Sequence, residues 1–189
     1  MNKILRLEIP VEPKRIGYII GKNGKNKQLL EKTFNIKIDV NSKDSTVILN
    51  ILENMRPIDV MKIKQAIKAL SIGFKIDDVL KMKEDIYQLE VIDLREVSRN
   101  WKDMQRIKGR IIGENGKTKK ILEEMTGATI IIGEREVGIL GDYEQIRIAR
   151  EAIRLIIAGR SHKTVYDYLR IQKRELKKRR MELWERWTL

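Results

Sequence analysis

The feature that most constrains this chain is an internal repeat. Ile16–Gly24 reads IGYIIGKNG and Lys108–Gly116 reads KGRIIGENG, and the match continues without gaps to Lys27, Leu30 and Glu31, each found again 92 positions later. A gap-free match of this length rarely arises by chance. The sequence therefore predicts two copies of one small domain within the 189 residues.

Hydrophobic periodicity predicts the elements of the first copy. Apolar residues alternate with polar ones at 4–9 and 36–40, which is typical of strands, and recur at helical spacing in the helical segments. The segment 46–52 is rich in residues that favour strands. Pro13 and Pro57 stand where a helix tolerates proline, at its first position. The predicted order is a strand at 4–9, a short helix from Pro13, the loop Gly21–Gly24, a second helix with Leu29, Leu30 and Phe34 on one face, strands at 36–40 and 46–52, and a last helix from Pro57.

The second copy repeats this order. Gly127 is placed to end a helix and Asp142 to cap the next one. We expect a strand at 86–97, a helix at Trp101–Ile112, the loop Gly113–Gly116, a helix at 117–125, strands at 128–132 and 137–140, and a helix from Asp142 to about Ala158.

The remaining C-terminal residues predict one long helix at 161–187, with Ser161 as its cap. Val165, Leu169, Leu176, Leu183, Trp184 and Trp187 supply apolar contacts, and a basic run follows Lys173. The predicted fold class is α+β, with domains at 1–78 and 79–160 and a basic amphipathic helix at 161–189. By count, these segments carry net charges of +6, +2 and +5.

The composition favours a polyanionic partner. The net charge is +13, and a soluble protein this basic usually binds nucleic acid, or less often an anionic membrane. The chain has no cysteine and one histidine, His162, which excludes disulfides and thiolate zinc sites and leaves no Ser-His triad in view; a packing or capping role fits His162 better than catalysis. We expect no enzyme activity, no cofactor, no metal site, no membrane segment and a cytoplasmic location.

The order β-α-α-β-β-α, with Gly-x-x-Gly between the first two helices, resembles the type I KH domain, and the resemblance covers most of residues 3–158 twice. It implies binding of single-stranded RNA or DNA, about four nucleotides per domain. Glycines would let the backbone approach a phosphate, and the N-terminus of the next helix would point its N–H groups at that phosphate.

The expected RNA-binding residues follow from this geometry, with bases lying over an apolar floor beside each loop. For the first copy they are Ile20, Gly21, Lys22, Asn23, Gly24, Lys25, Lys27 and Ile38, with Ile16 also in the floor. For the second copy they are Ile112, Gly113, Glu114, Asn115, Gly116, Lys117, Lys119, Lys120 and Ile130.

Two positions depart from the family pattern. Lys27 and Lys119 stand where many KH domains have an aliphatic residue, so they either add phosphate contacts or change the local packing. Glu114 places a carboxylate in the second loop where the first has Lys22, which weakens that site; Lys117, Lys119 and Lys120 are expected to compensate in part.

The glycine motif and the basic tail each have a second interpretation. Ile20 and Ile112 are also explained as core residues, and the glycines as a tight turn between helices. Gly116-Lys117-Thr118 looks like the end of a nucleotide-binding P-loop, but that motif needs glycine at position 111, where Ile111 stands. The basic run of the tail either forms a solvated helix face or extends the phosphate track.

The sequence GRIIGENGKTKKILEEMTGA at 109–128, with IAGRSHKTVYDYL at 157–169, resembles the archaeal tandem-KH small-subunit ribosome assembly factors, whose eukaryotic relatives act with the endonuclease Nob. The resemblance implies binding near the 3′ end of small-subunit ribosomal RNA. It also implies contact with other assembly or initiation proteins, such as the endonuclease or a translation initiation factor subunit. The alternatives are a KH adaptor for RNA decay or transcription, and a protein–protein scaffold with degenerate KH domains.

Overall fold

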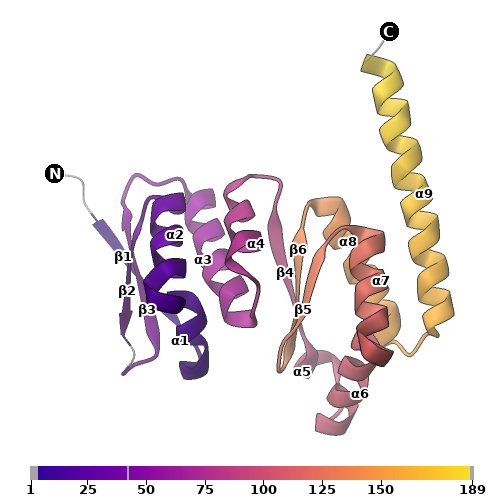
Figure 1. Cartoon of the computed structure of the whole chain (residues 1–189), viewed down its shortest axis with the longest axis horizontal. Helices are drawn as coiled ribbons and strands as arrows, with labels where there is room; N and C mark the ends of the chain where they lie inside the picture. Colours follow the sequence, from indigo (N-terminus) through magenta and orange to yellow (C-terminus); the bar gives the residue numbers. More distant parts are fainter. Residues whose placement is uncertain (1–3, 42, 188–189) are drawn as a thin grey trace. The chain divides into compact units, whose positions relative to one another are not determined.

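The chain folds into two compact units, residues 1–89 and 90–189. The computed structural model describes residues 4–41 and 43–187 (Figure 1). Each unit holds one three-stranded antiparallel sheet and one copy of the repeat, which confirms the α+β class and the tandem arrangement. The predicted boundaries at residues 78 and 160 stay predictions.

The first unit follows the expected order and adds a short helix. Its three strands pair in the order β1-β3-β2, with helices α1, α2 and α3 on one face of the sheet (Figure 1). The elements are β1 (Ile4–Pro10), α1 (Pro13–Ile20), the 3-10 turn η1 (Lys22–Gly24), α2 (Lys25–Phe34), β2 (Lys37–Asn41), β3 (Thr46–Leu52), α3 (Pro57–Ile72), the added α4 (Ile76–Leu80) and the 3-10 turn η2 (Lys81–Lys83).

Alternation in the central strand decides where the first core lies. Val47, Leu49 and Ile51 of β3 are buried, while the residues between them are partly exposed. This period of two turns one face of the strand toward the helices. Ile19 of α1 and Leu30 of α2 fill the space above that face, so the two helices that flank the Gly-x-x-Gly loop are anchored in the core.

The second unit repeats the layout with strand order β4-β6-β5. Helix α9 packs against α7 and α8, and its C-terminal half extends past them (Figure 1). The elements are β4 (Gln88–Asp93), α5 (Leu94–Val97), α6 (Trp101–Ile112), the 3-10 turn η3 (Glu114–Gly116), α7 (Lys117–Thr126), β5 (Thr129–Ile132), β6 (Glu136–Gly141), α8 (Tyr143–Ile157) and α9 (His162–Trp187).

One predicted strand was too long. The segment 86–97 is a strand only from Gln88 to Asp93. The Asp93 carboxylate accepts a 2.8 Å hydrogen bond from the Arg95 backbone N–H and so caps the short helix α5. A side-chain cap offers the backbone an alternative to the sheet, and apolar alternation does not reveal it.

The predicted helix signals at the other ends are confirmed. Asp142 and Gln145 form a reciprocal capping box at the start of α8, and Gly127 ends α7 in the left-handed conformation. Ser161 Oγ accepts a 3.2 Å hydrogen bond from the Thr164 N–H at the start of α9. Val165 and Leu169 of α9 are buried in the second core, whereas the side chains of Leu183, Trp184 and Trp187 lie outside the described part of the chain. Among the described helices, none has the length and apolar character needed to cross a membrane.

Candidate nucleic-acid interface

The two Gly-x-x-Gly loops have the same backbone conformation. The φ and ψ angles are 71° and 174° at Gly21, 54° and 31° at Asn23, and 75° and 9° at Gly24. The equivalent angles in the loop 113–116 are 74° and 175°, 50° and 30°, and 76° and 8°. The sequence repeat therefore reproduces a three-dimensional motif, with positive φ at the first glycine, the asparagine and the second glycine of each loop.

The two glycines of each loop have different reasons to be glycine. A Cβ on Gly113 would lie 2.8 Å from the backbone nitrogen of Thr118, so the first glycine leaves room for the start of the next helix. A Cβ on Gly116 would meet nothing within 4 Å. The second glycine is required by its φ alone, and the space beside it is open to a ligand.

The N-termini of α2 and α7 are open as well. No side chain caps either helix, because the N-cap residues are Gly24 and Gly116. The backbone N–H groups of Lys25 and Lys117 donate to the carbonyl oxygens of Lys22 and Glu114 in the preceding 3-10 turns. The helix dipole adds positive potential at both N-termini. An anion is thus the natural ligand at this point.

The charges around the two loops differ. Lys22 and Lys25 are exposed beside the first loop, and Lys117 takes the place of Lys25 beside the second. Within the described residues, none of these three ammonium groups forms an ion pair. Glu114 is exposed and stands where the first loop has Lys22. The first loop therefore has two nearby cations, and the second has one cation and one carboxylate.

Lys27 and Lys119 have an intramolecular partner. Lys119 Nζ lies 3.0 Å from the Glu123 carboxylate, and Lys27 Nζ lies 4.0 Å from Glu31. Lys120 is paired with Glu124 at 3.8 Å, although both side chains are largely exposed. Lys119 and Lys120 are thus already balanced by carboxylates, and they offset Glu114 less than the sequence suggested.

The expected apolar floor is only partly at the surface. Ile38 and Ile130 have no exposed surface, because their side chains point from the edge strands into the cores. A base cannot touch them in this structure, so their assignment as contact residues is corrected to core residues, and Ile16, 7% exposed, belongs with them. Ile20 is half-buried and Ile112 is 37% exposed, which leaves these two residues beside the loops as the accessible apolar surface.

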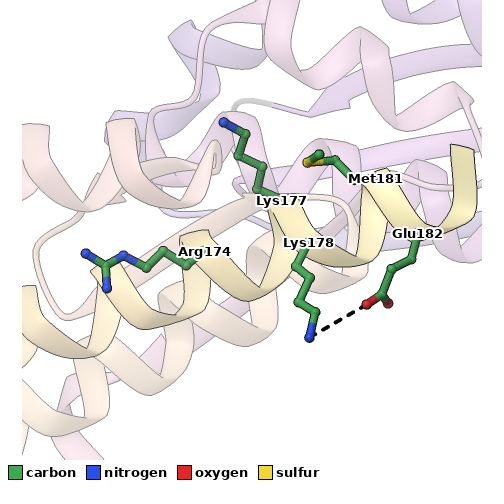
Figure 2. Close-up of a pocket in the computed structure, with 5 residues that line it drawn as sticks. All are labelled: Arg174, Lys177, Lys178, Met181 and Glu182. Atoms are coloured by element: carbon green, nitrogen blue, oxygen red, sulfur yellow. Dashed lines mark ion pairs between the residues drawn. The ribbon is translucent and has the colours of Figure 1, made fainter. Parts of the chain in front are cut away.

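A basic stripe runs along the outer face of α9. Lys163, Arg170, Arg174 and Lys177 follow at intervals of seven, four and three residues, on the side opposite the buried Val165 and Leu169. Arg170 is paired with Asp167 at 3.4 Å, and within the described residues Arg174 and Lys177 form no ion pair. Figure 2 shows the end of this stripe, where Arg174, Lys177, Lys178, Met181 and Glu182 line a shallow hollow and Lys178 pairs with Glu182 at 3.7 Å.

Sequence reasoning missed the residues that brace the loops from behind. Asn26 in the first copy and Thr118 in the second follow the second glycine by two positions, and each packs under the first glycine of its loop. The signal was present, because this position differs between two copies that otherwise match closely.

Two family models match the chain. Residues 6–70 match the KH domain, and residues 88–174 match the eukaryotic type KH-domain, described as KH-domain type I. The second match continues past α8 into α9, so this family model includes part of the C-terminal helix.

Individual relatives match nearly the whole chain. A KH domain-containing protein of Methanocaldococcus jannaschii is 33% identical over 95% of this chain and 78% of its own length. The pre-rRNA-processing protein PNO1 of Coccidioides immitis is 30% identical over 94% of this chain and 71% of its own length. A chain from the crystal structure of the a/eIF2alpha–aDim2p–rRNA complex of Pyrococcus horikoshii superimposes with a TM-score of 0.82 at 31% identity, covering 91% of this chain and 96% of that one.

The order of elements, the pair of loops and these relatives agree along both units. The chain belongs to the PNO1/Dim2 family of tandem KH-domain proteins.

Proposed function

We propose that this protein binds single-stranded RNA through its Gly-x-x-Gly loops and acts as a non-enzymatic ribosome biogenesis factor on the 3′ region of small-subunit ribosomal RNA. The observation that carries the proposal is the pair of matching loops, each with an uncapped helix N-terminus behind an unobstructed glycine. Relatives named for pre-rRNA processing and for a complex with rRNA support this choice of target.

The backbone of RNA would enter at the second glycine of each loop. A phosphate beside Gly24 would lie at the N-terminus of α2, where no side chain caps the helix and the helix dipole is positive, with Lys22 and Lys25 supplying charge. Equivalent groups in the second unit are the start of α7 and Lys117. The neighbouring bases would then lie on Ile20 or Ile112, and contacts to base edges would determine sequence choice.

The first loop is the stronger phosphate site on electrostatic grounds. Glu114 repels a phosphate that Lys22 attracts, and Coulomb energies at this range amount to about 1 kcal/mol or more for partly exposed groups. The second loop retains Asn115 and the same backbone, so we propose that it binds RNA with lower intrinsic affinity. It would still add to the overall affinity, because its covalent link to the first module raises the effective concentration of RNA already bound there.

Helix α9 would add sequence-independent contacts. Arg174 and Lys177 are exposed and unpaired within the described residues, so each is available to a phosphate. Among partners we propose a translation initiation factor subunit, which accompanies the relative from Pyrococcus horikoshii, and the assembly endonuclease, with the cytoplasm as the location.

A titration tests the central proposal. The protein is mixed with a short single strand from the 3′ end of small-subunit rRNA and with a scrambled strand, at two salt concentrations. We expect preference for the native strand and a log affinity that falls with log salt by about 0.7 per phosphate contact. Binding of neither strand would overturn RNA binding and leave the protein–protein scaffold. Equal binding of both would overturn the rRNA target and leave an adaptor without this sequence preference.

Variants of the two loops test whether RNA binds at the Gly-x-x-Gly loops. Replacing Lys22 and Asn23 by Asp, or Glu114 and Asn115 by Asp, adds negative charge at the proposed phosphate position while Asp still tolerates the left-handed conformation at the second site. The change in the first loop is expected to cost the larger share of affinity. Unchanged affinity in both variants would move the binding site to another face of the protein.

A further inference from the structure

The first loop is braced by a residue of its own module. Asn26 Nδ2 donates a 2.7 Å hydrogen bond to the carbonyl oxygen of Tyr18, which lies in the last turn of α1 and has no helical partner. The Asn26 side chain also packs under Gly21, since a Cβ there would lie 2.6 Å from Asn26 Cγ. One side chain thus ties the end of α1 to the start of α2 across the loop.

In the second loop, the residue under the first glycine does not bond to the end of the preceding helix α6. Tyr18 and Asn26 correspond to Arg110 and Thr118 under the spacing of the repeat. Thr118 is buried under Gly113, and its side chain fills the space that a Cβ on that glycine would need. Its hydroxyl forms a hydrogen bond with a residue of α9, not with α6. The Arg110 carbonyl, the counterpart of the Tyr18 carbonyl, needs another donor.

Helix α9 supplies both missing contacts. His162 Nε2 lies 3.0 Å from the Arg110 carbonyl oxygen, and because a carbonyl only accepts, Nε2 carries the hydrogen. The hydroxyl of Tyr166 lies 3.1 Å from Thr118 Oγ1. The two rings are stacked one helical turn apart, with centroids 6.1 Å apart and planes 13° from parallel.

The start of α9 is held firmly enough to serve as a brace. Val165 and Leu169, on the same two turns, are 0% and 1% exposed in the second core. The Arg110 guanidinium donates to the Ile156 carbonyl at 2.7 Å and to the Arg160 carbonyl, which fixes the connection between α8 and α9. Arg110 therefore contacts this connection through its side chain and His162 through its backbone.

We propose that His162 and Tyr166 are positioning residues for the second RNA-binding loop, and that together they replace the function that Asn26 performs in the first. The conformation of the loop 113–116 then depends on the docking of α9, whereas that of the loop 21–24 does not. The consequence for RNA affinity rests on the function proposed above; the consequence for loop order does not.

The first arm of the test measures loop order without RNA. Amide hydrogen exchange is followed at Gly113–Thr118 and at Gly21–Asn26 in the full chain. His162→Ala with Tyr166→Phe is expected to accelerate exchange in the second loop about three- to tenfold, the range for losing net hydrogen bonds, and to leave the first loop unchanged. Asn26→Ala is the matched control and should accelerate exchange in the first loop alone.

A rescue variant separates positioning from general destabilisation. Thr118→Asn, added to His162→Ala and Tyr166→Phe, restores the residue that the first module uses and can again reach the Arg110 carbonyl. We expect exchange in the loop 113–116 to return to within about twofold of the native rate. Faster exchange spread over the whole second unit, or a failure of Thr118→Asn to restore the loop, would overturn the proposal.

The second arm measures RNA affinity with the first loop inactivated by Lys22→Asp and Asn23→Asp. In that background the His162→Ala and Tyr166→Phe changes should weaken binding about three- to tenfold, and Thr118→Asn should recover it. If the native protein binds no RNA, the proposed function fails while the exchange arm still decides the role of α9. Loop loosening with undiminished affinity would overturn the RNA-positioning part.

Discussion

The carboxylate of Glu123 accepts a 2.8 Å hydrogen bond from the backbone N–H of Ile130. Ile130 lies on β5, an edge strand, so this N–H points away from the sheet and would otherwise be open to pairing with another chain. Lys119 neutralises the same carboxylate. The first module repeats the arrangement, with Glu31 accepting from Ile38 at 2.8 Å. The lysines that depart from the family pattern thus belong to a side-chain cover for each sheet edge.

Removing this cover should destabilise the second unit. Glu123→Ala leaves a half-buried N–H without a partner, and we expect a loss of about 1–3 kcal/mol in the free energy of unfolding. Glu123→Gln keeps an accepting oxygen and should cost less, about the 0–1 kcal/mol of a partly exposed ion pair. Denaturant unfolding measures both. Glu124→Ala, which removes an exposed carboxylate of equal charge, is the control; a loss there as large as that of Glu123→Ala would contradict the explanation.

Replacing glycine by alanine in and before the second loop should change stability by amounts that depend on the space around each glycine and on its φ. Gly116→Ala meets no neighbouring atom and is expected to cost about 1–2 kcal/mol of stability for its φ of +76°. Gly113→Ala has the same problem at φ +74° and also collides with the Thr118 backbone, so it should cost about 1–3 kcal/mol more. Gly109→Ala, inside α6 with open space around it, should stabilise by about 0.5–1 kcal/mol. Thermal unfolding of the three variants tests the order.

The basic stripe of α9 should be visible in the salt dependence of RNA binding. Arg174→Gln with Lys177→Gln is expected to lower the slope of log affinity against log salt by about 1.4, two contacts at about 0.7 each for a single strand. Arg150→Gln with Arg154→Gln removes the same charge from guanidinium groups that already pair with Glu90 and Glu151 at 3.2 and 2.9 Å. Equal slopes for the two double variants would show that Arg174 and Lys177 face solvent and do not contact phosphates.

The first unit should lose stability in acid through one pair. Lys62 is buried, donates to the Lys83 carbonyl at 3.1 Å and pairs with Asp85. A hydrogen bond and the charge of Lys62 hold the pKa of Asp85 below its usual value, with Arg56 acting in the same direction and Asp59 opposing it. A lowered folded-state pKa stabilises the fold above the unfolded value, about 3.9, and this stability is lost as the pH falls through the folded pKa.

Asp85→Asn should therefore weaken the first unit at pH 6, and its effect should shrink as the pH falls below the unfolded pKa. Hydrogen exchange of the α3 amides at several pH values measures the difference between the variant and the native chain. A difference that stays constant over this range would show that the Lys62–Asp85 pair does not link folding to protons.

Apolar periodicity together with the glycine, proline and capping residues predicted most of the fold. Trp101–Ile112 was predicted with the bounds that α6 has, and in the structure Asn100 caps its start and Gly113 follows its end. The missed helices α4 and α5 are short, and a segment of four or five residues is too short for a helical period to show. The burial of Ile38 and Ile130 was missed for a different reason, because alternation identifies the inner face of a strand but not how completely helices cover it.

The sequence by itself determined that two copies of one α/β module exist and where their glycine loops lie. These are properties of neighbouring residues, governed by steric limits on φ and ψ and by the spacing of apolar side chains. The tertiary structure alone decided that side chains of α9 form hydrogen bonds with the residues on both sides of the second loop. His162 meets Arg110 and Tyr166 meets Thr118 across about fifty residues of chain, and only the packing of α9 on the second core brings those donors and acceptors within reach.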